Sequence, residues 1–379
     1  MRFSDEQKQF AEAIASFCAR ECGTREQRLA LTEGGAIANS RELLEKLAEL
    51  GWLGVSVSEE YGGAGAGMVE ECIFLEETSR GLAPIRGYST AMTAGATYLR
   101  WGTEDQKREV MGGVCRGRLE SIALSEPGAG SDLGGVRCRA RLDDGTYVLD
   151  GQKTWISEAH LADHMLTLVR TDSSGTKHQG LTLLVVGTDT PGIELRGIET
   201  VEGNRVVNDV FFTDCRVPVD AVVGQPEQAW SQLMRGLAIE RLIIAAMSTG
   251  AARRSLEDVI AYVKEREQFG KPLSAFQAVR HRIADLATEI ACCRALIYDI
   301  AERIDAGEED QLSTESSMAK LKCTSVAKEA ALEGVQLMGG YGVAVEYGME
   351  EQLRSALAPP IYGGSNEIQR EIIGKNLGL

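Results

Sequence analysis

The chain has 379 residues, 44% hydrophobic and 25% charged, which is a globular composition and a length suited to two or three domains. A net charge of −16 disfavours nucleic acid and anionic membranes as partners, because both require a basic surface. No apolar run has the length of a membrane span, and the acidic first residues lack signal or transit character. We therefore expect a cytoplasmic protein.

Helical spacing dominates the first part of the chain. Ser4 and Gln7 have the spacing of a capping box, and apolar residues then recur along one stripe. Further helices are predicted over 42–50, 68–81 and 90–114. These elements predict an N-terminal α-helical domain over residues 1–116.

Short β-rich runs replace the helical period in the middle of the chain. Residues 147–149 lead through Asp150-Gly151 into 153–156, which predicts a hairpin, because Asp-Gly is typical of two-residue hairpin turns. Further strands are expected, at the spacing of a sandwich or small barrel, over 166–169, 181–186, 193–195 and 210–212. We expect a middle β domain over 117–224.

Long helices return in the last part of the chain. Apolar stripes with charged opposite faces extend over 228–264, 276–306 and 313–338. They predict a C-terminal helical domain over 225–379. The fold class expected for the whole chain is therefore α+β and multidomain.

Cysteine and histidine usage bears on redox state and metals. The nine cysteines are scattered and form no C-x-x-C pair, so we expect reduced, mostly buried thiols rather than a disulfide framework. His160 and His164 are four positions apart but have no convincing third ligand, so no metal site is expected.

The most informative loop spans Ser125 to Asp132 and follows the apolar run 121–124. Gly128, Ala129 and Gly130 let the backbone pass close to a large ligand, and exposed N–H groups at a strand end suit a phosphate-bearing cofactor or substrate. The alternative is a simple turn. No P-loop and no strand followed by G-x-G-x-x-G is present, which disfavours both common nucleotide-binding folds.

Two further segments suit a large cofactor, and each has a purely structural alternative. Trp155 ends a predicted strand and either packs into the β core or forms an aromatic wall beside a planar group, with Ser157 offering a hydroxyl. Arg266 closes a long helix, where it either complements the negative helix end or, beside Gln268, holds a pyrophosphate.

Glu240 is the most unusual single residue. It interrupts the apolar helical stripe of Leu237, Ile243, Ile244 and Met247. One interpretation is an exposed charge pair with Arg241, since charged residues are usually exposed. The other is a general base whose pKa is raised by desolvation.

Two glycine-containing segments lie near the C-terminus. Tyr362-Gly363-Gly364 precedes a predicted helix with Ser365 as its N-cap. Gly340 belongs to a glycine run after Gln336 that is typical of a helix terminator. Taken alone, both are structural.

Taken in order, these segments and two others resemble the acyl-CoA dehydrogenase family, and the likeness covers nearly the whole chain. Each segment is weak alone, but their order and spacing are highly specific. The segments are 59–63, 125–132, 150–157, 216–218, 266–272 and 336–342.

The resemblance implies an α-helical N-terminal domain, a β-barrel or sandwich middle domain and a C-terminal four-helix bundle, assembled as a homotetramer or dimer. It implies FAD as the cofactor and an acyl-CoA as the substrate. The residues implied to contact FAD are Leu124, Ser125, Ser131, Trp155, Ser157, Arg266, Phe269, Gln277, Gln336, Gly340, Ser365 and Glu367. Those implied to reach the FAD of a neighbouring subunit are Arg266, Phe269, Gln336 and Gly340. The residues implied to hold the acyl-CoA are Ser131, Arg241, Tyr362 and Gly363.

The reaction that the resemblance implies is α,β-dehydrogenation of an acyl thioester. A carboxylate removes the α-proton, the β-hydrogen leaves as hydride to flavin N5, and electrons pass to an electron-transfer flavoprotein. Many members carry the catalytic glutamate straight after the tyrosine that Tyr362 matches, where this chain has Gly363. A minority, resembling isovaleryl-CoA, long-chain and several steroid-side-chain dehydrogenases, place it at the position of Glu240.

We therefore expect Glu240 to be the base and Gly363 to leave room for a branched, cyclic or otherwise bulky acyl group. A smaller departure is Glu158, at a position where asparagine is common.

Other functions remain open on the same residues. An acyl-CoA oxidase or an enoyl-CoA reductase would use the same fold. A flavin monooxygenase has no use for an α-proton base, so Glu240 disfavours it. A non-catalytic flavin-binding subunit is disfavoured by the presence of the loop, Trp155, Arg266 and a base in one chain.

Overall fold

The computed structural model describes residues 3–379, which form two compact units. We call them the helical unit and the sheet unit. The helical unit comprises the chain up to Arg28, Gly67–Ala83 and Ala238–Leu379. The sheet unit comprises Leu29–Ala66 and Pro84–Leu237.

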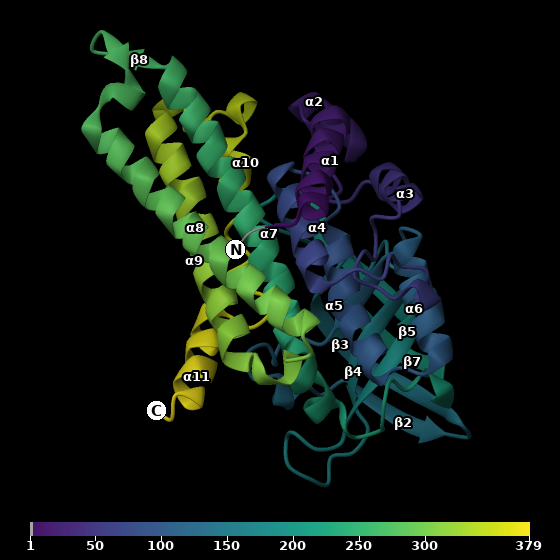
Figure 1. Ribbon diagram of the computed structural model, residues 1–379. Helices are drawn as coiled ribbons and strands as arrows, with labels where there is room; N and C mark the ends of the chain where they lie inside the picture. Colours follow the sequence, from purple (N-terminus) through teal and green to yellow (C-terminus); the bar gives the residue numbers. More distant parts are fainter. Residues whose placement is uncertain (1–2) are drawn as a thin grey trace. The chain divides into compact units, whose positions relative to one another are not determined.

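Long helices build the helical unit (Figure 1). Its first helix begins at the predicted capping box, where Ser4 Oγ accepts from Gln7 N and Gln7 Oε1 accepts from Ser4 N. The helices are α1 (Asp5–Cys22), α4 (Met68–Arg80), α8 (Gln277–Asp305), α9 (Ser313–Met338), α10 (Met349–Ser355) and α11 (Asn366–Asn376). Two further helices, α2 (Arg25–Leu31) and α7 (Ala229–Glu265), begin in one unit and end in the other. A hairpin of β8 (Glu267–Gln268) and β9 (Lys271–Pro272) separates α7 from α8.

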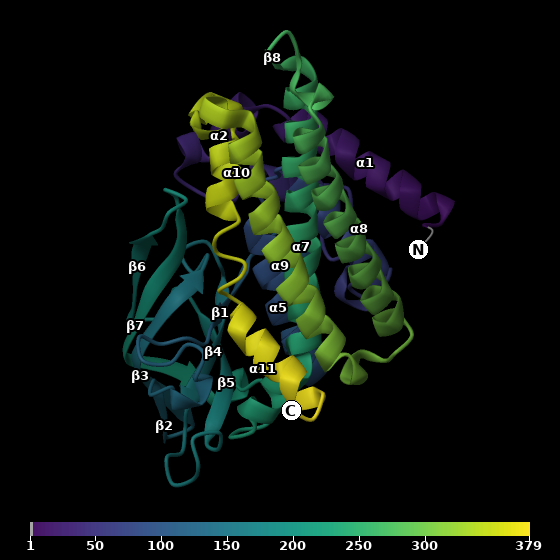
Figure 2. The same ribbon diagram turned by 90° about the vertical axis from the view of Figure 1, so that its left-hand side faces the viewer.

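Helix α9 is central to the packing of the helical unit. Helices α8, α10 and α11 all pack against it, and Figure 2 shows α11 beside its first half. Helix α4 packs against α1 and α8, so it lies within this unit although the chain between α4 and α7 belongs to the sheet unit. One apolar cluster joins α7, α9 and α10 through Val259, Val263, Leu337, Met338 and Met349.

The sheet unit holds three helices and the seven long strands. The helices are α3 (Arg41–Glu49), α5 (Arg86–Trp101) and α6 (Glu104–Cys115). The strands are β1 (Glu120–Ala123), β2 (Arg139–Asp143), β3 (Thr146–Ser157), β4 (His164–Arg170), β5 (Leu181–Gly187), β6 (Ile193–Glu199) and β7 (Arg205–Pro218). They form one seven-stranded sheet in the order β1-β4-β2-β3-β7-β6, with β5 paired to β4.

The core of the sheet unit is apolar and includes two of the cysteines. Its fully buried members include Ala123, Leu149, Val169, Leu184 and Val210, which come from five different strands. Helix α5 packs on β1, and β1 pairs in parallel with β4. The strand that precedes the Ser125–Asp132 loop is therefore held on two sides.

The hairpin predicted at Asp150-Gly151 is wrong. Residues Thr146–Ser157 form the single strand β3, and Gly151 lies inside it with φ 150° at a register shift against β7. The turn lies earlier, at Asp144 and Gly145, which join β2 to β3 with φ 47° and 75°. A tight hairpin turn requires positive φ at both of its central residues, and Asp-Gly is a residue pair that adopts this conformation readily. The chain contains two such pairs, at 144–145 and 150–151. The first pair takes the turn, and Gly151 instead lets Cys138 approach.

All nine cysteines lie within residues 3–379 and are free thiols, and all except Cys292 are buried, as the sequence predicts. Across these residues no helix is both long and apolar enough to cross a bilayer.

Candidate active site

The Ser125–Asp132 loop follows β1 and is held from within by a buried carboxylate. Glu126 N donates to Ala129 O and Ala129 N donates to Glu126 O, both at 3.0 Å, so the loop closes on itself. The Glu126 carboxylate accepts from the backbone N–H groups of Arg137 at 2.6 Å and Cys138 at 2.8 Å. These bonds anchor the loop to the start of β2.

A buried lysine fastens the same loop to β3. Lys153 has no exposed side-chain surface, and its Nζ lies 2.8 Å from Glu126 Oε1 and donates to Leu124 O at 2.9 Å. Thr154 N donates to Ser125 O at 2.9 Å. Neither Glu126 nor Lys153 is among the site residues predicted from the sequence. The acid inside the glycine-containing loop was a signal for Glu126, whereas Lys153 lies between the polar residues Gln152 and Thr154 and has no such local signal.

The outer side of the loop is open. Gly128, Gly130 and Ser131 are exposed, and a Cβ built at either glycine would meet nothing within 4 Å. Exposed backbone N–H groups on a rigidly held loop can receive an anionic ligand. Hydrogen bonds from Arg137, Cys138, Lys153 and Thr154 therefore fix the interior of the loop, while its outer surface is exposed.

Trp155 does not pack into the β core. It is 61% exposed, has φ 63°, and lies in a β-bulge between Lys153 and Ile156. The bulge turns the indole out of the sheet, one residue after Thr154, which is bonded to Ser125 at the start of the loop. Ser157 O accepts from Ser121 Oγ at 2.6 Å, which ties the end of β3 to β1. An exposed aromatic face next to a glycine loop fits a planar, phosphate-bearing cofactor.

Glu158 follows Ser157 directly and is 1% exposed. Burial raises its pKa from 4.5 to about 7, although Arg86 and Asn39 favour the charged form. Glu202 opposes them. Because the pKa of Glu158 is higher in the folded chain, the folded state holds the proton more tightly, and stability falls as pH rises between 4.5 and 7.

Glu158→Gln is expected to stabilise the protein at alkaline pH. The variant removes a buried negative charge. This should raise the free energy of unfolding by up to about 3 kcal/mol above pH 7 and by little at pH 5. The measurement is the thermal midpoint of wild type and variant at pH 5 and 8.5. Glu199→Gln, at an exposed position on β6, is the control and should show no pH-dependent gain. An equal change at both pH values for Glu158→Gln would contradict this linkage.

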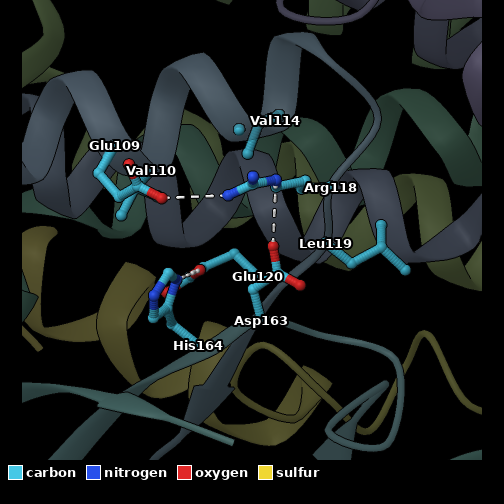
Figure 3. Close-up of a pocket in the computed structure, with 9 residues that line it drawn as sticks. Glu109, Val110, Val114, Arg118, Leu119, Glu120, Asp163 and His164 are labelled. Atoms are coloured by element: carbon cyan, nitrogen blue, oxygen red, sulfur yellow. Dashed lines mark hydrogen bonds and ion pairs between the residues drawn. The ribbon is translucent and has the colours of Figure 1, made fainter.

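A small pocket of about 190 Å³ lies at the start of β1 (Figure 3). Buried Glu120 accepts from the Tyr98 hydroxyl at 2.6 Å and lies 3.5 Å from His164 Nδ1. That contact raises the pKa of His164, while burial raises the pKa of Glu120. The charged lining also includes Glu109, Arg118 and Asp163. The contacts of Glu120 with Tyr98 and His164 join β1 to α5 and β4.

In the helical unit, Glu240 lies on α7 and is only partly exposed. Burial raises the pKa of its carboxyl group, and Arg241 and Lys320 oppose this effect. Arg241 is buried and donates to Ser313 O at 3.4 Å, so the two residues do not form the exposed charge pair considered as the alternative. The pKa of Glu240 is therefore raised at a partly buried position, which is compatible with the predicted role of a general base.

Gly363 lies directly against Glu240. A Cβ built on Gly363 would be 3.6 Å from Glu240 Oε1 and 2.3 Å from Ile244 Cδ1, and φ is 62°. The space next to Gly363 is therefore occupied by Ile244. The absence of a side chain lets the turn close over α7, which is a different consequence from open room for substrate.

Three other predicted residues lie at the same turn. Ser365 is the N-cap of α11 and accepts from Ile368 N at 3.4 Å, so its structural interpretation is correct. Glu367 and Tyr362 are exposed. Their contacts with a cofactor or substrate stay predictions.

The remaining predicted residues lie at the far end of the helical unit. Arg266, Phe269, Gln277, Gln336 and Gly340 are all exposed. Arg266 stacks on Tyr341 with Cζ 5.4 Å from the ring centroid, and Phe269 is 93% exposed with φ 55°. About 39 Å of helix separates Arg266 from Glu240 at the usual rise per residue. These five residues therefore do not lie beside Glu240.

Three domain families together match almost the whole chain. Residues 4–118 match the family described as "Acyl-CoA dehydrogenase, N-terminal domain". Residues 121–215 match "Acyl-CoA dehydrogenase, middle domain", and residues 228–378 match "Acyl-CoA dehydrogenase, C-terminal domain".

Individual proteins are similar over their full length. The crystal structure of an acyl-CoA dehydrogenase from Geobacillus kaustophilus has a TM-score of 0.92 and 34% identity, covering 100% of this chain and 99% of that one. A mitochondrial 2-methylacyl-CoA dehydrogenase of Solanum tuberosum is 32% identical over 98% of this chain and 90% of its own. The "Caffeyl-CoA reductase-Etf complex subunit CarC" of Acetobacterium woodii is 32% identical over 98% of both.

Proposed function

Because the chain belongs to the acyl-CoA dehydrogenase family, we propose that it catalyses FAD-dependent α,β-dehydrogenation of an acyl-CoA with Glu240 as the base. The observation that carries this proposal is the position of Glu240. Its carboxyl group is partly buried against the Gly363–Gly364 turn, and burial raises its pKa toward the range useful for proton transfer.

In this proposal Glu240 removes the α-proton of the thioester and holds it on its carboxyl group. The flavin that these residues would hold would supply the acceptor for the β-hydrogen, which would leave as hydride. Burial favours the neutral acid after transfer, while Arg241 and Lys320 favour the carboxylate before it. Burial and the two nearby cations therefore have opposite effects on the pKa of Glu240, so that neither protonation state is strongly disfavoured in this proposal.

We assign FAD binding to two sets of residues. In the sheet unit the rigid glycine loop and the exposed indole support contacts from Leu124, Ser125, Ser131, Trp155 and Ser157. In the helical unit we keep Ser365 and Glu367 beside Glu240. The remote set of Arg266, Phe269, Gln277, Gln336 and Gly340 is assigned to the FAD of a second copy, in a homotetramer or dimer. The length of α7 supports this division.

For the substrate we propose a branched, cyclic or otherwise bulky acyl group, held by Ser131, Arg241, Tyr362 and Gly363. Support comes from the likeness to a 2-methylacyl-CoA dehydrogenase and from the lack of a side chain at Gly363. Ile244 limits this room, since its Cδ1 occupies the position of the missing Cβ.

A second candidate is reduction of an enoyl-CoA on the same site. It is favoured by equal identity to the Acetobacterium woodii reductase subunit, whose name also links it to an electron-transfer flavoprotein. We propose such a flavoprotein as electron partner here as well, with an acyl-CoA oxidase as the outcome if oxygen accepts the electrons instead. The free thiols support a reducing compartment such as the cytoplasm.

The test is anaerobic addition of straight, branched and ring-bearing acyl-CoAs to the FAD-loaded protein. Bleaching of the flavin band by saturated thioesters supports dehydrogenation, and strongest bleaching by bulky ones supports the substrate proposal. Reoxidation of the reduced flavin by an enoyl-CoA, with no bleaching by any saturated thioester, would favour the reductase. Rapid reoxidation by air, and none by electron-transfer flavoprotein, would favour the oxidase.

A further inference from the structure

Lys320 on α9 is a buried lysine that lies beside the turn covering Glu240. Its side chain has no solvent-exposed surface. Lysine is almost never fully buried unless its charge is paired. Nζ donates to Gly364 O at 2.8 Å and to Asn366 Oδ1 at 3.2 Å. Both acceptors are neutral, so these bonds use two of the three N–H groups and leave the positive charge unneutralised.

The acceptor Gly364 belongs to the turn that covers Glu240. Gly363 and Gly364 have φ of 62° and 76°, so the turn uses backbone conformations that favour glycine. Gln369 Nε2 donates to the carbonyls of both glycines at 3.1 and 3.0 Å. Lys320 and Gln369 therefore hold the turn whose first glycine lies so close to Glu240 that an added Cβ would be 3.6 Å from Glu240 Oε1.

The charged groups around Lys320 come from two other helices. Glu240 and Arg241 face it from α7, and Glu367 faces it from α11. Burial lowers the pKa of Lys320 to about 8, while Glu240 and Glu367 favour its charged form and Arg241 disfavours it. Lys320 is one of the two cations that favour the ionised form of Glu240, the other being Arg241.

A structural role alone needs only a hydrogen-bond donor. A buried positive charge is costly, and a neutral amide can donate to the same two oxygens. The positive charge of Lys320 has a counterpart in the Glu240 carboxylate, which favours the charged form of Lys320.

We propose that Lys320 is a positioning residue for proton abstraction, holding the Gly363–Gly364 turn against Glu240 and supplying the positive charge that keeps Glu240 ionised until substrate binds. This inference rests on the proposed function in taking Glu240 as the base.

Three variants separate the charge from the hydrogen bonds. Lys320→Met removes both, and Lys320→Gln removes the charge while keeping a donor. Lys322→Met is the matched control, because Lys322 lies on the same helix, is 43% exposed and pairs with Glu289 on α8.

The first measurement is the pH dependence of flavin reduction by an acyl-CoA. We expect the acidic limb of the rate profile to move up by about one pH unit in Lys320→Met and Lys320→Gln, because Glu240 loses a nearby cation. Lys322→Met should follow the wild-type profile. A wild-type profile for Lys320→Gln would overturn the proposal even if Lys320→Met fails to fold.

The second measurement needs neither flavin reduction nor substrate. Thermal midpoints are compared at pH 7 for wild type, Lys320→Gln, Glu240→Gln and the double variant. We expect Lys320→Gln to lower the midpoint less when Glu240 is already glutamine, because the attraction is then absent. Strictly additive changes would overturn the proposal. Failure of the proposed function has a different signature: Glu240→Gln reduces its flavin as fast as wild type.

Discussion

Replacing Glu240 with glutamine is expected to slow flavin reduction by acyl-CoA by roughly 10²–10⁴-fold, the usual contribution of a general base. The amide has nearly the shape of the carboxylate but cannot accept the α-proton. FAD content and acyl-CoA binding should be retained, because the side chain keeps its place against the Gly363–Gly364 turn. Anaerobic stopped-flow bleaching of the flavin band measures the rate constant directly.

Two variants make this experiment specific. Glu257→Gln makes the same change on the same helix, at a carboxylate that pairs with Arg80, and should reduce flavin at the wild-type rate. Glu240→Asp keeps the base but shortens its reach, so its rate should lie between wild type and Glu240→Gln. Equal rates for Glu240→Gln and Glu257→Gln would refute Glu240 as the base.

The long helices of the C-terminal part and most strands could be predicted because their signal is local. The single helix predicted over 90–114 is wrong, because α5 ends at Trp101 and α6 begins at Glu104, after the N-cap Thr103. Apolar periodicity predicts α7, α8 and α9 to within a residue or so, and the capping box at Ser4 is correct. The predicted position of the hairpin turn was wrong because the two Asp-Gly pairs are equivalent in local chemistry. Only the pairing of β3 with β2 and β7 decides that Gly145, not Gly151, forms the turn.

The candidate site was predictable where a charged residue stands in an otherwise apolar helical pattern. Glu240 interrupts an apolar stripe, and its partial burial beside the turn agrees with that signal. Lys153 and Lys320 could not be selected, because each is defined by partners distant in sequence, Glu126 and Gly364. The room expected beside Gly363 stays a prediction, and the position of Ile244 Cδ1 beside this glycine could not be read from the sequence.

Glu76 is the second residue whose replacement should have a large effect, here on stability. It lies on α4 with no exposed surface, and its Oε1 is 2.7 Å from Arg253 Nη1 on α7 and 2.8 Å from Arg294 Nε on α8. Oε2 accepts from the Tyr298 hydroxyl, also on α8. One carboxylate therefore joins three helices of the helical unit.

Glu76→Gln is expected to lower the free energy of unfolding by about 3–5 kcal/mol, because it leaves guanidinium groups without their buried counter-charge. Arg253 keeps its contact with Glu77 at 2.6 Å, and Arg294 is 37% exposed and can be hydrated, so the lower end of that range is favoured. For a unit of this size the thermal midpoint should fall by roughly 6–12 °C.

Glu257→Gln is again the matched control. It removes a carboxylate from the more exposed pair with Arg80, and surface pairs contribute about 0–1 kcal/mol. The comparison therefore isolates burial, since both variants remove one charge from an arginine partner in the same unit. Equal midpoints for Glu76→Gln and Glu257→Gln would show that the network is dispensable and that apolar packing alone joins α4 to α7 and α8.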